Sequence, residues 1–198
     1  MIRCDMKIGL FGGSFDPVHQ GHSQLAEQAL LQFDLDRVIW IPAYFSPFKD
    51  ESAMIASAEQ RMAMVRLACA TFPKFEVSDF EIHRKIPSYA IDTVMHMRSV
   101  YPQAELYWIL GQDAFEGLPK WRNFETLSRE LIFLVGGRAD RSFHFAGFAG
   151  RAELIDVSLH PAASSDLRKT LPLGEGWESL HPDVRNYIRS QKLYGAKP

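Results

Sequence analysis

The chain has 198 residues, of which 46% are hydrophobic and 23% are charged, and its formal net charge is −2. This size and composition are typical of one globular domain with a sizeable core, and the weak negative charge gives no electrostatic footprint for a nucleic-acid partner. No apolar run approaches the roughly 20 residues that span a bilayer, and Cys4 and Cys69 form neither a CxxC pair nor a metal-ligand spacing. We therefore expect a cytoplasmic protein without a membrane or nucleic-acid partner, and we leave open whether it forms a homodimer.

The opening stretch KIGLFGGSFDPVHQGH has the pattern of a ligand site. It begins as an apolar strand at Ile8–Phe11, turns at Gly12–Gly13 and enters a helix near His22. A strand, a glycine turn and a helix start together offer backbone N–H groups and a positive dipole end to a phosphate. His19 and His22, three residues apart, could face the same ligand. The stretch contains neither the Walker loop nor the GxGxxG fingerprint, and an isolated HxxH would more often be two surface histidines.

The rest of the chain alternates helical and extended patterns. Ser88 is expected to cap the third helix, and the polar segment before it is expected to be a loop, as is the glycine-rich segment 136–150. The expected helices cover residues 22–34, 57–71, the segment after Ser88, the segment around 164–169 and a closing segment after Gly176; the expected strands cover residues 37–42, 75–79, 105–113, 130–135 and, more weakly, 153–158.

Strands that alternate with helices predict an α/β fold. We expect a doubly wound, Rossmann-like, mainly parallel sheet with helices on both faces, in a single domain of residues 1–198 whose C-terminal part, from about residue 164, is helical. In such sheets ligands bind at the carboxyl ends of the strands. Gly12–Gly13, the segment after Pro42 and the stretch Gly111–Asp113 all follow expected strands, so we expect them to meet at one rim.

The segment AASSDLRK at 162–169 has the pattern of a capped helix start with a cation. Ser164 or Ser165 can cap the helix, and Arg168 follows four residues after Ser164. A helix start beside an arginine could hold the outer phosphates of a nucleotide. Taken alone, such a segment would more often be a structural cap beside an exposed arginine.

These motifs resemble those of a known family. GGSFDPVHQGH resembles the HxGH signature of the adenylyltransferases in the nucleotidyltransferase superfamily, and it is most similar to the bacterial nicotinate-nucleotide adenylyltransferases. SPFKD, PSYAIDT, LGQDAFEGLPKW, AASSDLRK and LHPDVRNYIRSQKLYG resemble further elements of that family, in register over nearly the whole chain. The similarity is weakest at 136–163. The sequence departs from the family pattern at Phe48, Ala90, Arg122 and Ala163.

The resemblance implies a direct transfer of AMP from ATP to nicotinate mononucleotide, in NAD biosynthesis. Catalysis would fall to His19, His22, Lys49 and Arg168, and Mg²⁺ would be bound through the ATP phosphates, without a protein metal ligand. The implied ATP contacts are Gly12, Gly13, Ser14, Phe15, His19, His22, Gly111, Asp113, Ser164, Ser165 and Arg168. The implied contacts of nicotinate mononucleotide are Lys49, Ser88, Tyr89, Ala90, Thr93, Trp121 and Arg122.

Several other functions are compatible with parts of the sequence. The acceptor could be nicotinamide mononucleotide or phosphopantetheine, or the protein could be a nucleotide sensor without catalysis. A class I aminoacyl-tRNA synthetase shares the HxGH element, but no KMSKS-like loop is present. A zinc-binding or nucleic-acid-binding module would have to use His19, His22, His83 and His96, which are scattered along the chain.

Overall fold

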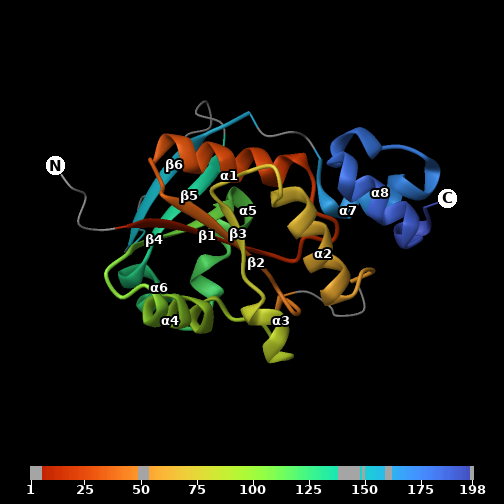
Figure 1. The fold of residues 1–198 in the computed structure, drawn as a ribbon. Helices are drawn as coiled ribbons and strands as arrows, with labels where there is room; N and C mark the ends of the chain where they lie inside the picture. The colour runs from red at the N-terminus through yellow and green to blue at the C-terminus, as the bar shows by residue number, and fades with distance from the viewer. Residues whose placement is uncertain (1–5, 49–53, 138–147, 149, 159–161, 197–198) are drawn as a thin grey trace.

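A computed structural model describes residues 6–48, 54–137, 148, 150–158 and 162–196 of the chain (Figure 1). Within these residues, six strands form one sheet in the order β3-β2-β1-β4-β5-β6, and all neighbouring pairs are parallel. The strands are β1 (Lys7–Gly13), β2 (Arg37–Pro42), β3 (Phe75–Val77), β4 (Glu105–Gly111), β5 (Ile132–Gly137) and β6 (Arg151–Asp156). The strand order reverses between β1 and β4, and this reversal opens a crevice at their carboxyl ends.

The apolar runs of the strands supply two cores because successive side chains point to opposite faces. In β4, for example, Tyr107 and Ile109 belong to one buried cluster, whereas Leu106, Trp108 and Leu110 belong to the other. This two-sided burial explains why the central strands read as continuous apolar runs in the sequence. It also confirms the predicted Rossmann-like sheet with helices on both faces.

The helices divide between the two faces of the sheet, with α1, α2 and α8 packed in one cluster and α4 and α6 in the other (Figure 1). The eight α-helices of the described residues are α1 (Gln20–Gln32), α2 (Ala58–Cys69), α3 (Phe80–Arg84), α4 (Ala90–Val100), α5 (Gln112–Glu116), α6 (Phe124–Glu130), α7 (Ser164–Thr170) and α8 (Pro182–Ser190). None of them is long and apolar enough to cross a membrane.

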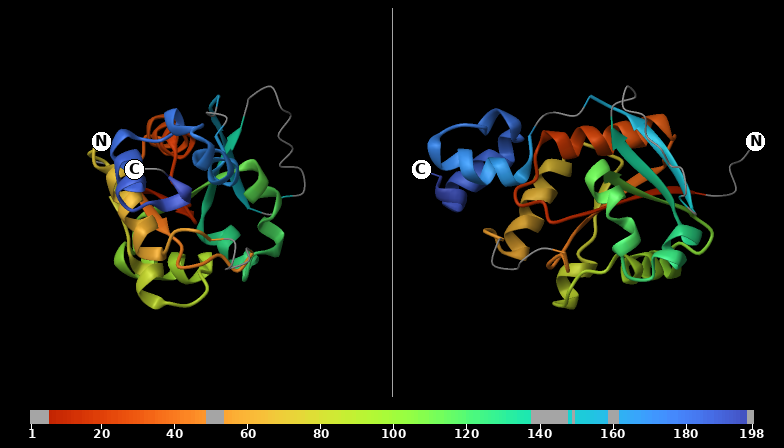
Figure 2. Two further views of the ribbon diagram at one scale, coloured as in Figure 1. Left: turned by 90° about the vertical axis from the view of Figure 1, so that its right-hand side faces the viewer. Right: turned by 180° about the vertical axis from the view of Figure 1, so that it is seen from behind.

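The C-terminal segment is helical from Ser164 onward and lies beside α2 at one end of the molecule (Figures 1 and 2). Val184 and Ile188 of α8 are fully buried in the same cluster as Met64 and Val65 of α2. The segment therefore shares a core with the main body.

Several local predictions were wrong. The segment expected to be a polar loop before Ser88 begins with the helix α3, and two short helices, α5 and α6, were not predicted. Helix α1 begins at Gln20 rather than near His22, and β5 begins at Ile132, after α6 has ended at Glu130. The predicted strand at 130–135 therefore began two residues too early, since Glu130 is the last residue of α6 and Leu131 is its C-cap.

Two predicted helix caps were also wrong. Helix α4 begins after Tyr89, and the Ser88 hydroxyl instead accepts a hydrogen bond from the Tyr44 N–H at 3.0 Å. Helix α7 has Ala163 at its N-cap position and no side-chain cap. The Ser164 hydroxyl donates to the Pro17 carbonyl at 2.9 Å, so a tertiary partner has replaced the local one.

Candidate active site

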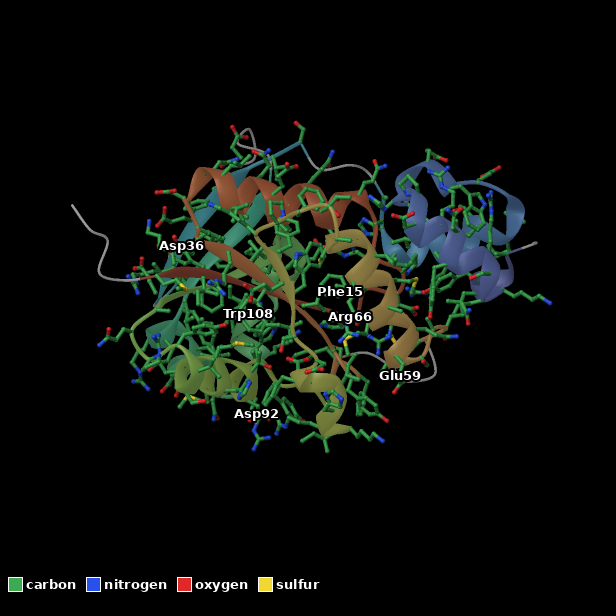
Figure 3. The ribbon with its side chains drawn as sticks, in the orientation of Figure 1. Phe15, Asp36, Glu59, Arg66, Asp92 and Trp108 are labelled. Atoms are coloured by element: carbon green, nitrogen blue, oxygen red, sulfur yellow. The ribbon has the colours of Figure 1, made fainter. Side chains whose placement is uncertain are left out.

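The predicted ligand segments after β1 and β2 meet at the carboxyl end of the sheet. Gly12 and Gly13 end β1 directly opposite Ile41 and Pro42 of β2. Both glycines adjoin aromatic rings: an added Cβ would lie 2.8 Å from Trp108 at Gly12 and 2.9 Å from Phe15 at Gly13. Phe15 and Trp108 are nearly completely buried, between the sheet and its helices (Figure 3). The turn predicted at Gly12–Gly13 was wrong, because both glycines continue the strand and the chain turns at Asp16–Pro17. The glycines let two aromatic side chains pack against the backbone at the end of β1.

The two histidines of the HxGH element stack against each other at the start of α1. Their ring centroids are 3.7 Å apart, and the His19 backbone N–H donates to His22 Nδ1 at 3.2 Å. A neutral His22 ring must then carry its proton on Nε2. Phe15 packs edge-on against His22 at 5.1 Å, which limits the movement of that ring. No acidic residue occupies the first turn of α1, so the positive end of its dipole is not neutralised there.

Asp16 connects this turn to the C-terminal segment. Its side chain is 1% exposed, and it accepts hydrogen bonds from the Ile55 and Ala56 N–H groups at 3.0 and 3.2 Å and from the Tyr194 hydroxyl at 2.6 Å. The Arg168 guanidinium donates to the Asp16 carbonyl at 2.7 Å. Arg168 and the histidine-bearing turn are thus brought together, as the sequence predicted.

A buried arginine that the sequence analysis missed supports the same loops. Arg61 of α2 is 1% exposed, and its guanidinium donates to the carbonyls of Ser14, Ala43 and Tyr44 at 2.7 Å and of Ala56 at 3.3 Å. Burial lowers the pKa of Arg61, and the Asp16 carboxylate acts in the opposite direction. No local pattern predicted this role, because the four acceptors are backbone groups.

A pocket of about 160 Å³ opens beside Gly12 and Gly13, at the carboxyl end of β1. It is lined by Gly12, Gly13, Ser14, Ala43, Ser46, Pro47, Phe48, Glu81, Ser88, Tyr89, Ala90, Trp108, Trp121 and Arg122. Trp108 and Trp121 meet edge to face, with ring centroids 5.7 Å apart. The Arg122 guanidinium lies 4.9 Å from the centroid of the Tyr89 ring, at the pocket wall. The described lining of the pocket therefore combines two indole rings with the Arg122 guanidinium.

Glu81 is an acidic residue of the described pocket lining, and sequence analysis did not single it out. It is 5% exposed and accepts hydrogen bonds from the hydroxyls of Thr93 and Ser88. Burial raises its pKa, with the two hydroxyls acting in the opposite direction. Thr93 is itself fully buried, so it supports the pocket through Glu81 and does not line the opening.

The remaining predicted residues lie around these two groups. Gly111 ends β4, and Asp113 is exposed in the first turn of α5. Ser165 is exposed in the first turn of α7, and Phe48 is exposed at the pocket. Lys49 lies outside the described residues. In the segment 136–150, which was predicted to be a loop, Gly136 and Gly137 instead end β5, and residues 138–147 and 149 lie outside the described part of the chain. Phe148 packs against the rings of Phe115, Phe124 and Phe133.

The described residues contain no group of three or more His, Cys, Asp or Glu side chains that could hold a metal ion. The His83 side chain is exposed and lies 3.4 Å from Asp79, and His96 stacks on Phe80, with ring centroids 4.0 Å apart. Neither histidine joins the HxGH pair in a cluster, so the zinc-module alternative receives no support from the described part of the chain.

Comparison with known proteins places this geometry in a family. A family model described as cytidylyltransferase-like matches residues 10–170. A probable nicotinate-nucleotide adenylyltransferase of Synechococcus sp. (strain JA-3-3Ab) is 39% identical, covering 95% of this chain and 94% of its own length. A protein of the same name from Methylacidiphilum infernorum (isolate V4) is 43% identical, covering 95% and 92%.

A solved structure shares the fold. The Plasmodium falciparum nicotinic acid mononucleotide adenylyltransferase, complexed with NaAD, superposes with a TM-score of 0.81. It covers 97% of this chain and 98% of its own chain, at 19% sequence identity. At that identity the likeness establishes the arrangement of the sheet and helices.

Proposed function

Because the chain belongs to the cytidylyltransferase-like family and, within it, to the nicotinate-nucleotide adenylyltransferases, we propose that it transfers AMP from ATP to nicotinate mononucleotide. The products are deamido-NAD and pyrophosphate, so the enzyme acts in NAD biosynthesis. The observation that carries the proposal is the carboxyl end of β1, where Gly12 and Gly13 are the last two residues of the strand. Gly12, Gly13 and Ser14 line the aromatic pocket, and the chain then turns at Asp16–Pro17 and leads into His19, which stacks on His22.

The reaction requires positioning and charge stabilisation more than a strong base. A phosphate oxygen of the mononucleotide attacks the α-phosphorus of ATP, and the bond to pyrophosphate breaks in line. Because the attacking phosphate is already anionic, the protein has to align the two anions and stabilise charge on the transferred and leaving groups. We assign His19 to the α-phosphate and His22 with Arg168 to the β- and γ-phosphates.

The other ATP contacts follow from the positions of the same loops. We assign Asp113 to the ribose hydroxyls, because it follows the end of β4 at the switch point of the sheet. Gly111, Ser164 and Ser165 remain proposed contacts of the nucleotide. Lys49, outside the described residues, is proposed to hold the attacking phosphate.

The aromatic pocket suits a pyridine ring with a carboxylate. Trp121 offers an indole for stacking, and Arg122 offers a cation for the carboxylate. The Tyr89 and Ala90 backbone lies at the start of α4, where N–H groups are free of helical partners. Glu81 would repel an acid if it were ionised, but burial favours its neutral form. This charge arrangement favours nicotinate over nicotinamide as the acceptor base.

We expect magnesium to enter the site with ATP as part of the substrate. Mg²⁺ usually keeps several waters and binds through substrate phosphates and few carboxylates. Asp16, the buried carboxylate nearest the histidine turn, is engaged by three hydrogen-bond donors. The Asp16 carboxylate oxygens are therefore poorly placed to coordinate Mg²⁺. A cytoplasmic location and a single catalytic domain belong to the same proposal.

Release of pyrophosphate in the presence of ATP and Mg²⁺ tests the proposal, with nicotinate mononucleotide, nicotinamide mononucleotide and phosphopantetheine offered in parallel. We expect a large preference for nicotinate mononucleotide. A preference for either of the other acceptors would overturn the assignment of the pocket but retain the chemistry. Absence of turnover in folded protein that binds ATP would favour a nucleotide sensor.

A further inference from the structure

The buried Asp16 carboxylate joins parts of the chain that are far apart in sequence. Its Oδ1 accepts from the Tyr194 hydroxyl at 2.6 Å, a contact that spans 178 residues, and also from the Ala56 N–H. Its Oδ2 accepts from the Ile55 N–H and lies 3.9 Å from an Arg168 guanidinium nitrogen. Tyr194 is 3% exposed, so its hydroxyl reaches Asp16 inside the protein.

The state of the Tyr194 hydroxyl suits it to donate to this carboxylate. Burial and the adjacent Asp16 charge raise the pKa of Tyr194 far above its usual value, so the phenol keeps its proton. A buried carboxylate needs such donors, because its desolvation is costly unless its oxygens are satisfied. The neighbouring cations, Arg61 and Arg168, are the other groups that can compensate its charge.

These two cations differ in their freedom to respond. Arg61 is 1% exposed and held by four carbonyls. The Arg168 side chain is 23% exposed, and within the described part of the chain its guanidinium donates to the Asp16 carbonyl. If a donor to the Asp16 carboxylate were lost, Arg168 would be the cation able to move toward it. That movement would take positive charge away from a nucleotide bound beside the turn.

We propose that Tyr194 is a positioning residue for ATP: its hydroxyl satisfies the Asp16 carboxylate and thereby leaves Arg168 available to the nucleotide phosphates. The inference rests on the proposed function, since it takes Arg168 as a phosphate contact. It gives the C-terminal segment a role beyond core packing. A residue four positions from the end of the chain sets the affinity of a site built around residues 12–22.

Titration of ATP in the presence of Mg²⁺ and without acceptor tests this role in the full-length chain. Tyr194→Phe removes only the hydroxyl, and we expect it to raise the Kd of ATP about tenfold, which corresponds to about 1.4 kcal/mol. In an Arg168→Ala background the same substitution should leave the Kd unchanged, because the cation through which it acts is gone. Such non-additivity is the signature of two residues that act through one contact.

Two matched variants separate positioning from general destabilisation. Tyr187→Phe removes the same hydroxyl group from α8, and Val184→Ala removes buried core contacts from that helix. We expect both to retain the wild-type Kd of ATP in folded protein, as judged by circular dichroism.

Each contrary result has a distinct meaning. An unchanged Kd of ATP in Tyr194→Phe would refute the inference. It would also be refuted if Tyr194→Phe raised the Kd by the same factor with and without Arg168, or if Val184→Ala raised the Kd as much as Tyr194→Phe does. Failure of the wild-type chain to bind ATP or release pyrophosphate would instead refute the proposed function.

Discussion

Replacing Arg61 by methionine should be among the most destabilising single changes outside the aromatic core. The variant keeps a long apolar stem but removes a guanidinium that is 1% exposed and donates to four carbonyls. Adding about 1.5–3 kcal/mol for each charged hydrogen bond would overstate the loss, because the desolvation cost of the cation disappears with it. Removal of one partner from a buried charge pair typically costs about 3–5 kcal/mol. Since Asp16 also loses a nearby cation, we expect about 4 kcal/mol.

Urea denaturation, followed by circular dichroism, measures this loss. With a slope of about 2 kcal/mol per molar urea, 4 kcal/mol shifts the midpoint by roughly 2 M. Arg66→Met is the matched control, because Arg66 lies on the same helix (Figure 3) but its side chain is 60% exposed, 4.0 Å from Asp79. An exposed pair of this kind contributes at most about 1 kcal/mol. Equal midpoints for the two variants would refute the view that Arg61 holds the loops of the site together.

Three further changes test individual features of the pocket. Gly12→Ala places a Cβ 2.8 Å from a buried indole carbon, so we expect a loss of about 1–3 kcal/mol in urea denaturation; Gly111→Ala, where an added Cβ meets nothing within 4 Å, is the control, and an equal loss in both would contradict the steric argument. Because burial raises the pKa of Glu81 above its usual value of about 4.5, the free energy of unfolding of the wild type should fall as the pH rises from about 4.5 through the raised pKa. Glu81→Gln should flatten that fall, and an unchanged pH profile of urea midpoints would show that the group titrates normally. Arg122→Ala should raise the KM for nicotinate mononucleotide about tenfold, because it removes a charged contact of about 1.5 kcal/mol. Lys120→Ala, at an exposed residue nearby, is the control and should leave the KM unchanged. Equal KM values for Arg122→Ala and wild type would show that Arg122 does not belong to the acceptor site.

Sequence pattern was sufficient for features that depend on neighbours along the chain. Continuous apolar runs predicted the buried strands, and their alternation with helices predicted the doubly wound sheet. The Ser57 cap of α2, which accepts from the N–H of Gln60 three residues later, is a feature of the same local kind, although the sequence analysis did not single it out. The two glycines and the HxGH pair also lie within one short stretch, so their proximity was readable from spacing alone.

Predictions were wrong where a tertiary partner competed with a local one. Ser88 and Ser164 both had the sequence context of helix caps, yet each hydroxyl bonds to a distant backbone group, of Tyr44 and Pro17 respectively. A hydroxyl can satisfy either kind of partner, and the choice depends on which groups the folded chain brings within reach. Spacing along the sequence contains no information about that choice.

The sequence by itself therefore determined the parallel sheet, its two covered faces and the position of the two glycines at the carboxyl end of the first strand. Tertiary structure alone decided how the site is held together. Arg61 donates to carbonyls of two loops, the β1–α1 and the β2–α2 connections, and Tyr194 reaches Asp16 across 178 residues. Secondary structure follows from periodic burial, which repeats every few residues, whereas these buried polar contacts exist only after the sheet has brought separate loops to one edge.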